Sequence, residues 1–298
     1  MNCLINPADV EKPLKWKGIL AEIGFGRGDF TVRLAKLNPN RVVVGFELSG
    51  ISIEKLLKRV RKENLKNVFC VQMDAFWGFY FLLEDHSVDR IFINYPDPWF
   101  KKKHHKRRLT SRKNLLMFSK KLNHGGCILL RTDHYPFLEY TLEEAKNTGC
   151  LESSVRELSI DEPLTKYESK WLSKGKKLYE IRLTKISEPP STGFPSIKEV
   201  ARLFPVRIEG EPRFEHIENR ELRPSDKVIV KTFRAFSRQD SYLIETLLSE
   251  EGFTQKFLVE VRRKESFWIA DVSGFSQVIR TEGIQKAIEL VARELVRP

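Results

Sequence analysis

Short apolar runs alternate with amphipathic stretches over the first 185 residues of this 298-residue chain. The runs are almost continuously apolar, as is typical of parallel strands that are covered on both faces. We predict seven strands, at residues 19–23, 42–46, 68–71, 90–94, 127–131, 155–158 and 178–184. Helical periodicity is clearest at residues 29–37, 52–63 and 136–147. The alternation predicts an α/β fold with a doubly wound, mostly parallel sheet.

The composition shifts to Pro, Ser, Thr and Gly at residues 187–196, which indicates a linker. The pattern beyond it predicts strand, helix, strand, strand and helix, at residues 227–236, 241–250, 255–262, 266–272 and 283–296. We therefore expect an α/β domain at 1–188, a linker at 189–225 and a small α+β module at 226–298. The module's role stays open between a stabilising cap and a contact surface that uses Phe267, Trp268 and Phe275.

The chain carries a formal net charge of +12, which favours a polyanionic partner. Most of the excess lies before the linker, because residues 189–298 hold 18 Lys and Arg against 17 Asp and Glu. We therefore expect any contact with nucleic acid to lie mainly in the first domain.

Cysteine usage and hydropathy indicate a cytoplasmic protein. The four cysteines are scattered, and we expect them to be reduced and mostly buried. No apolar run is long enough to cross a membrane, and the first 17 residues lack the pattern of a signal or transit peptide. The adjacent His104 and His105 have no Cys or carboxylate partner in register, so no metal site is predicted.

A glycine-rich turn follows the first predicted strand. Gly24, Gly26 and Gly28 lie between Glu22 and the helix that starts at Asp29. Glycines at such a turn let the backbone approach a ligand, which then faces the N-terminus of the helix. The spacing G-x-G-x-G differs from the G-x-G-x-x-G of dinucleotide sites and is typical of class I S-adenosylmethionine-dependent methyltransferases. Taken alone, the turn also fits a tight connection that binds nothing.

Carboxylates at the ends of the next two strands favour a nucleoside cofactor. Glu47 lies 23 residues after Gly24, where a carboxylate can accept both ribose hydroxyl protons. Asp74 follows the third strand, at the expected place for a contact with the adenine amine. Each alone also fits an ordinary strand end or turn. The prediction therefore depends on Glu22, Glu47 and Asp74 together.

The fourth predicted strand leads into a stiff loop in which two prolines flank Asp97. Tyr95 and Trp99 border the prolines, and either ring is a candidate for stacking on a base or for packing in the core. Six Lys and Arg residues then occur within residues 101–108. A charge run is most often solvated surface, but beside this loop it favours contacts with RNA phosphates.

In order and spacing, these motifs resemble the bacterial tRNA (guanine-N7)-methyltransferase family, TrmB. The resemblance covers residues 15–186 and includes Thr132-Asp133 and the Thr-x-Tyr-Glu motif at 165–168. It implies methyl transfer from S-adenosylmethionine to N7 of a guanosine in tRNA, typically position 46 in the variable loop. Residues 189–298 depart from the pattern, because ordinary members lack this region.

The resemblance also assigns a role to each matched residue. It implies that Asp97 is catalytic and that the cofactor is bound by Glu22, Gly24, Gly26, Glu47, Asp74 and Asp97. The implied contacts with the guanosine are Lys101, Asp133, Thr165, Lys166, Tyr167 and Glu168. The implied contacts with the rest of the RNA are Lys103, His104, His105, Lys106, Arg107 and Arg108.

The chemistry of N7 defines what Asp97 would do. N7 carries an in-plane lone pair and no proton, so its methylation needs no general base. We therefore expect Asp97 to accept hydrogen bonds from N1–H and N2–H of guanine as positive charge develops on the ring. Two alternatives stay open: an RNA methyltransferase of other base or position specificity, and a non-catalytic RNA-binding protein on a Rossmann-like fold. The cofactor acids argue against the second.

Overall fold

The computed structural model describes residues 3–10, 13–99, 108–158, 168, 171, 177–238 and 240–297. The chain divides into two compact units, Met1–Phe194 and Pro195–Pro298, which we call unit 1 and unit 2.

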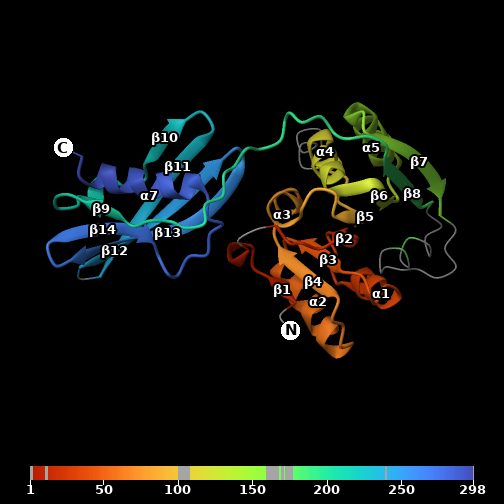
Figure 1. The fold of residues 1–298 in the computed structure, drawn as a ribbon, viewed down its shortest axis with the longest axis horizontal. Helices are drawn as coiled ribbons and strands as arrows, with labels where there is room; N and C mark the ends of the chain where they lie inside the picture. Colours follow the sequence, from red (N-terminus) through yellow and green to blue (C-terminus); the bar gives the residue numbers. More distant parts are fainter. Residues whose placement is uncertain are drawn as a thin grey trace. The chain divides into compact units, whose positions relative to one another are not determined.

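Unit 1 is built on an eight-stranded sheet in the order β1-β4-β3-β2-β5-β6-β8-β7 (Figure 1). Its strands are β1 (Leu4–Ile5), β2 (Ile19–Ile23), β3 (Val43–Glu47), β4 (Val68–Gln72), β5 (Val88–Asn94), β6 (Leu122–Thr132), β7 (Leu151–Glu157) and β8 (Tyr179–Lys185). Neighbouring strands are parallel, except that β8 runs antiparallel to both β6 and β7. The mostly parallel sheet is thus confirmed. The count of seven is wrong, because the two residues of β1 are too few to give a hydrophobic pattern.

Helices cover both faces of this sheet (Figure 1). They are α1 (Asp29–Leu37), α2 (Gly50–Lys62), α3 (Ala75–Leu82), α4 (Arg112–Lys121) and α5 (Tyr135–Thr148), and a 3-10 turn, η1 (Pro7–Asp9), precedes β2. Val43 packs with α1 and α2, whereas Phe46 of the same strand lies 4.9 Å from the Phe79 ring of α3. An added Cβ at Gly78 would lie 2.5 Å from the Phe46 ring, so glycine permits this close approach.

The strand order reverses direction at β2, which lies between β3 and β5. The chain passes outward from β2 to β3 and β4 on one side and later to β5 and β6 on the other. In such sheets, the loops beyond the carboxyl ends of the strands form the ligand site at the reversal point. The predicted cofactor residues lie at or just after the carboxyl ends of β2, β3, β4 and β5, and therefore at this edge.

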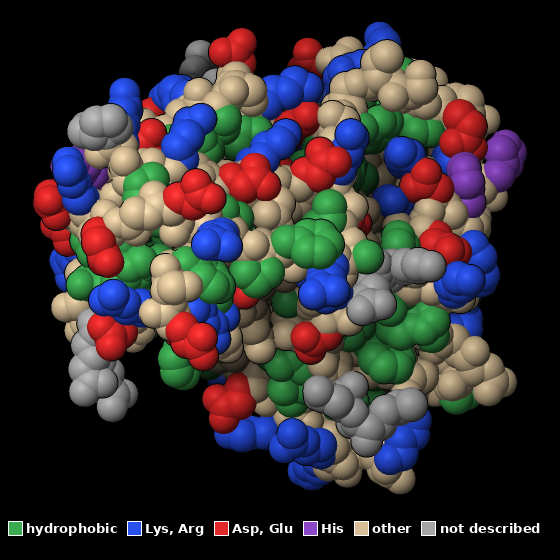
Figure 2. Space-filling view, turned by 60° about the vertical axis from the view of Figure 1, so that its left-hand side comes forward, with side chains coloured by type: hydrophobic (Ala, Val, Ile, Leu, Met, Phe, Trp, Pro, Cys, Tyr) green, Lys and Arg blue, Asp and Glu red, His purple; other side chains and the backbone are tan. Residues whose placement is uncertain are grey.

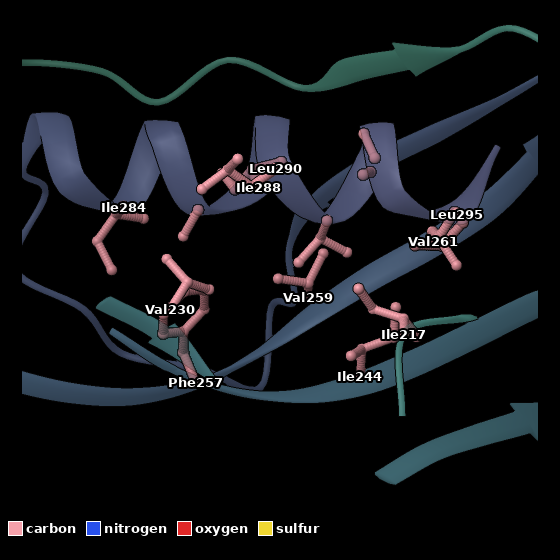
Figure 3. Close-up of a cluster of buried hydrophobic side chains, with 14 of the residues drawn as sticks. Ile217, Val230, Ile244, Phe257, Val259, Val261, Ile284, Ile288, Leu290 and Leu295 are labelled. Carbon is pink, nitrogen blue, oxygen red and sulfur yellow. The ribbon is translucent and has the colours of Figure 1, made fainter. Parts of the chain in front are cut away.

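Unit 2 contains a six-stranded antiparallel sheet in the order β10-β11-β12-β13-β14-β9. Its elements are β9 (Val206–Ile208), η3 (Phe214–His216), β10 (Glu221–Ser225), β11 (Val228–Arg238), β12 (Ser241–Glu250), β13 (Phe253–Lys264), β14 (Phe267–Val272) and α7 (Glu282–Leu295). Helix α7 lies along one face of the sheet and buries a row of aliphatic side chains against it, which includes Ile284, Ile288 and Leu295 (Figure 3). Unit 2 therefore contains a sheet and a helix.

Two details of the prediction for this region are wrong. Residues 241–250 form β12 and not a helix. The helical spacing comes from four apolar residues, of which Ile244 and Leu248 lie on one face of the strand and Leu243 and Leu247 on the other. The predicted linker at 189–225 contains β9 and β10, which are the two edge strands of the sheet. Both strands are short, so the alternation of apolar and polar residues along them is too brief to predict a strand.

The core of unit 2 provides a graded test of its packing. Ile288 is fully buried against the sheet, so Ile288→Val should leave a methyl-sized gap and lower stability by about 0.5–1.5 kcal/mol. Faster amide hydrogen exchange along β13 would report the loss locally. Glu289→Gln, on the exposed side of α7, is the matched control and should change exchange little.

Surface and thiol properties agree with the composition. Lys and Arg side chains are interspersed with Asp and Glu over the face in Figure 2. All four cysteines are free, and Cys70, Cys127 and Cys150 are buried, as predicted. Within the described part of the chain, no helix is both long and apolar enough to cross a membrane.

Candidate active site

The glycine-rich turn between β2 and α1 borders open space. Gly24, Gly26 and Gly28 have φ angles of 73°, 53° and 75°, in the left-handed region that favours glycine. A Cβ added at Gly24 or Gly26 would meet no atom within 4 Å, whereas one at Gly28 would lie 2.5 Å from Leu56. The first two glycines therefore leave room for a ligand, and the third serves the packing of α1 on α2.

Glu22, near the end of β2, is a buried carboxylate beside this turn. It accepts hydrogen bonds from the Thr31 hydroxyl at 2.5 Å and from Asn94 Nδ2 at 3.2 Å. Burial raises the pKa of Glu22 to about 7; the two hydrogen bonds oppose the rise, and the nearby Glu47 carboxylate adds to it. The site thus holds a carboxyl group that changes its charge near neutral pH.

This shift predicts a pH-dependent stability. Because the folded pKa lies above the unfolded value of 4.5, the fold favours the protonated form, and stability is lost as pH rises from 4.5 to 7. The loss amounts to about 3 kcal/mol. Glu22→Gln stays neutral, so its unfolding free energy in urea should fall less than that of the wild type between pH 4.5 and pH 7.5. If the unfolding free energies of the two proteins changed equally with pH, the raised pKa of the buried Glu22 carboxyl group would be contradicted.

Glu47 and Asp74 have local structural roles that place their carboxylates at the same edge. Glu47 Oε2 accepts from the Gly26 N–H at 3.0 Å, and its Oε1 accepts from the N–H groups of Leu48 and Ser49 at 2.8 and 3.0 Å. Asp74 is the N-cap of α3, where its Oδ1 accepts from the Phe76 N–H at 3.0 Å. Glu47 thereby ties the end of β3 to the glycine turn, so two of the predicted cofactor elements are in direct contact.

The loop that follows β5 is held at both ends. Tyr95 and Trp99 have φ angles of 52° and 46°, a conformation that is uncommon for residues other than glycine. The Tyr95 N–H donates to the Arg131 carbonyl at 2.9 Å, and the Pro98 carbonyl accepts from Arg108 Nε at 2.9 Å. Asp97, between these anchors, is exposed. The loop thus presents this carboxylate to solvent from a fixed backbone.

Arg108 does not lie on the surface, in contrast to its predicted contact with RNA. Its side chain is 5% exposed, and its guanidinium lies 4.3 Å from the centre of the Tyr140 ring in α5. Its position at the end of a basic run suggested a phosphate contact. Its burial instead assigns it to holding the Asp97 loop.

Glu168 is likewise buried and is not free for direct contact with a guanosine. It is 0% exposed and forms a 2.8 Å ion pair with Arg131 Nη1 of β6. Burial and then this carboxylate raise the pKa of Tyr95 well above its usual value, so the phenol keeps its proton and donates to Glu168 Oε1 at 3.2 Å. Arg131 Nε also binds Glu180 of β8 at 3.0 Å. Glu168 therefore anchors Tyr95, which leaves less of that ring available for stacking.

The remaining predicted residues divide into two groups. Asp133 follows β6 and precedes α5, so it lies at the same edge as the acids. Lys101, Lys103, His104, His105, Lys106, Arg107, Thr165, Lys166 and Tyr167 lie outside the described residues. The sequence did not point to Thr31, which hydrogen-bonds to Glu22, or to Arg131, which forms an ion pair with Glu168. The one signal was the position of Arg131 near the end of a predicted strand.

The strand order, the glycine turn and the acids at the carboxyl edge define a class I S-adenosylmethionine-dependent methyltransferase. Consistent with this class, a family model described as a putative methyltransferase matches residues 17–181. The chain is 50% identical over 298 residues to the tRNA (guanine-N(7)-)-methyltransferase of Aquifex aeolicus, an alignment that covers 99% of this chain and 100% of that protein. The chain therefore belongs to the tRNA (guanine-N(7)-)-methyltransferase family.

Some relatives share unit 2. The enzyme of the same name from Thermus thermophilus is 33% identical over 279 residues, covering 93% of this chain and 88% of that protein. The alignment with the Geobacillus kaustophilus protein, at 36% identity over 166 residues, covers 53% of this chain and 75% of that protein. Unit 2 is therefore a shared feature of part of the family.

Proposed function

We propose that this chain methylates N7 of a guanosine in tRNA, at position 46 of the variable loop. Family membership, with a relative of that name aligned over nearly the whole chain, is the observation that carries the proposal. S-adenosylmethionine supplies the methyl group. Two observations support a fit between this cofactor and the site: the open space at Gly24 and Gly26, and the acids at the ends of successive strands.

Each of these acids has a role suited to its position. Glu47, held by three backbone N–H groups, faces the glycine turn and would accept the ribose hydroxyls. Asp74 keeps one oxygen on its helix cap and would offer the other to the adenine amine. Glu22 would complete the pocket floor with Asn94. These contacts orient the ligand, and none of them removes a proton.

The residues of the Asp97 loop would act on the guanine. When bound, S-adenosylmethionine would supply a sulfonium methyl group: N7 would bond to the methyl carbon as the carbon–sulfur bond breaks, with its electron pair going to sulfur. No proton leaves the base, and positive charge develops on the ring. Asp97 would stabilise that charge by accepting hydrogen bonds from the base, and the anchored backbone of its loop would reduce reorganisation during the reaction. Asp133, at the adjacent strand end, would help to position the nucleoside.

A direct assay tests the proposal. The protein is incubated with labelled S-adenosylmethionine and unmodified tRNA, and the product is treated with borohydride and aniline, which cleave the chain at 7-methylguanosine. Label in the tRNA with cleavage at one variable-loop guanosine is expected. Label without cleavage would indicate another base or ring atom, and cleavage elsewhere would indicate another position. A tRNA that binds without becoming labelled would favour the non-catalytic alternative.

A further inference from the structure

The sheet of unit 2 has one face covered by α7 and one face that no described helix covers. Side chains alternate along β13, where Phe257, Val259 and Val261 point into the core beneath α7 (Figure 3). Their neighbours on the opposite face, such as Lys256 and Leu258, are exposed or half-buried.

A groove of about 670 Å³ involves this open face. Phe233, Arg234, Glu245, Lys256, Leu258 and Phe275 are among its lining residues. Glu245 and Leu258 are register partners on β12 and β13, so the groove runs across the strands. The register of β11 shifts between Thr232 and Ala235, which takes Phe233 and Arg234 out of the regular ladder. The bulge and the loop after β14 therefore contribute aromatic rings to one groove.

Two of the phenylalanine rings that line this groove are open to solvent. Phe275 is 88% exposed and Phe233 is 38% exposed. Among the described residues, neither packs against another ring. Exposed aromatic side chains gathered in one concave site are typical of a binding surface.

The cations of the groove are also available. Among the described residues, Arg234 and Lys256 form no ion pair, whereas Lys231 of the neighbouring ladder is paired with Glu221. Among the described residues of the groove lining, Glu245 is the one carboxylate, so two cations outside any described ion pair face one acid. The combination of aromatic faces with unpaired cations matches the way proteins bind single-stranded nucleic acid.

We propose that this groove binds unpaired nucleotides of the tRNA substrate. Bases would stack on Phe275 and Phe233, phosphates would lie at Arg234 and Lys256, and Glu245 would accept a hydrogen bond from a base amine. The inference rests on the proposed function, which makes tRNA the polyanionic ligand. It gives unit 2 a role in substrate binding that the near-neutral total charge of this unit did not suggest. The total charge does not show this role, because only Arg234 and Lys256 in the groove would contact the phosphates.

Stacking is tested in the full chain by Phe275→Ala. We expect the Kd for unmodified tRNA, measured by filter binding, to rise about tenfold, as for the loss of one stacked base. Phe204→Ala is the matched control, because Phe204 is also exposed in unit 2 but does not line the groove. Phe275→Trp should retain wild-type affinity, since a larger ring preserves the stacking face. An unchanged melting temperature for all three verifies that the fold is intact.

The cations are tested by the double variant Arg234→Gln/Lys256→Gln. Loss of two phosphate contacts should reduce the slope of log K against log salt by about 1.4. Lys264→Gln, at the exposed end of β13 and outside the groove lining, should leave the slope unchanged.

Wild-type affinity and salt slope in the groove variants would overturn the inference. A change of oligomeric state in these variants with unaltered tRNA affinity would do the same, and would indicate that a second copy of the chain occupies the groove. These results are separable from failure of the proposed function. If wild-type protein produces 7-methylguanosine while the variants bind tRNA normally, the groove inference alone fails. If wild-type protein produces none, the proposed function fails and tRNA loses its standing as the ligand.

Discussion

Replacing Asp97 by asparagine should lower kcat for tRNA methylation by about 10²- to 10³-fold, with a much smaller change in KM for tRNA. The variant is isosteric, so the loop anchored at Tyr95 and Pro98 keeps its backbone. What changes is the negative charge that, in the proposed mechanism, would face the guanine as its ring becomes cationic. An interaction that strengthens as the transition state forms appears in kcat rather than in uniform binding.

Steady-state kinetics with labelled S-adenosylmethionine measure this effect. Glu152→Gln, which makes the same chemical change on the exposed outermost strand β7, is the control and should retain wild-type kcat. A near-normal rate for Asp97→Asn would refute the stabilising role. A solvent deuterium isotope effect close to unity is also expected, because no proton is removed from N7. A large effect in wild-type protein would instead show that a proton transfer limits turnover, in conflict with direct attack by N7.

The first unit was readable from the sequence because its signals are local. Most side chains of β2, β4 and β5 are buried, so each strand contains a nearly continuous apolar run. Glycine is demanded by the backbone at positions 24 and 26, and Glu47 stands at a strand end next to them. The glycines of the turn and the carboxylate that contacts them are therefore close together in sequence. Because they follow or end parallel strands, their positions along the chain also show that they lie at the carboxyl edge of the sheet.

The burial of charged residues was not readable in the same way. Arg108 ends a run of cations and looks like surface, but the ring of Tyr140 and the Pro98 carbonyl enclose it. Glu168 stands in a motif that resembles a substrate contact, although Arg131 and Tyr95 occupy its oxygen. Each partner is distant in sequence, so no local spacing predicts the pairing.

Strand β12 shows how amphipathic patterns mislead when both faces of a sheet carry apolar residues. Ile244 and Leu248 pack under α7, whereas Leu243 and Leu247 lie on the other face, where they are only half-buried. The four together mimic a helical stripe. A half-covered sheet produces this ambiguity, and the same open face creates the groove in unit 2.

Replacing Arg131 by methionine should destabilise unit 1 by about 3–5 kcal/mol. The guanidinium is 15% exposed and binds two carboxylates, Glu168 and Glu180, whose side chains are 0% and 9% exposed. Methionine fills much of the same volume but provides no charge. Glu168 would then be left in the interior without the guanidinium that balances its charge, which is the costly outcome for a buried pair.

The change in unfolding free energy is measured by urea denaturation of the full chain, followed by circular dichroism. Arg156→Met is a matched control, because Arg156 binds the same Glu180 at 2.5 Å but is 68% exposed, and its loss should cost less than about 1 kcal/mol. If Arg131→Met destabilises no more than this control, the buried network is not what holds the unit together.

A second substitution separates the charge from the packing. Adding Glu168→Gln to Arg131→Met removes the carboxylate charge that Arg131 balances, so the double variant should be more stable than the single one, with a coupling energy in the range of contacting residues. The Tyr95 hydroxyl can still donate to the amide oxygen. If Glu168 positions Tyr95, and through it Asp97, Arg131→Met should also lower kcat, and the double variant should regain part of it. Recovery of stability without recovery of kcat would show that Arg131 itself, and not the anchoring of Tyr95, sets the geometry of the loop.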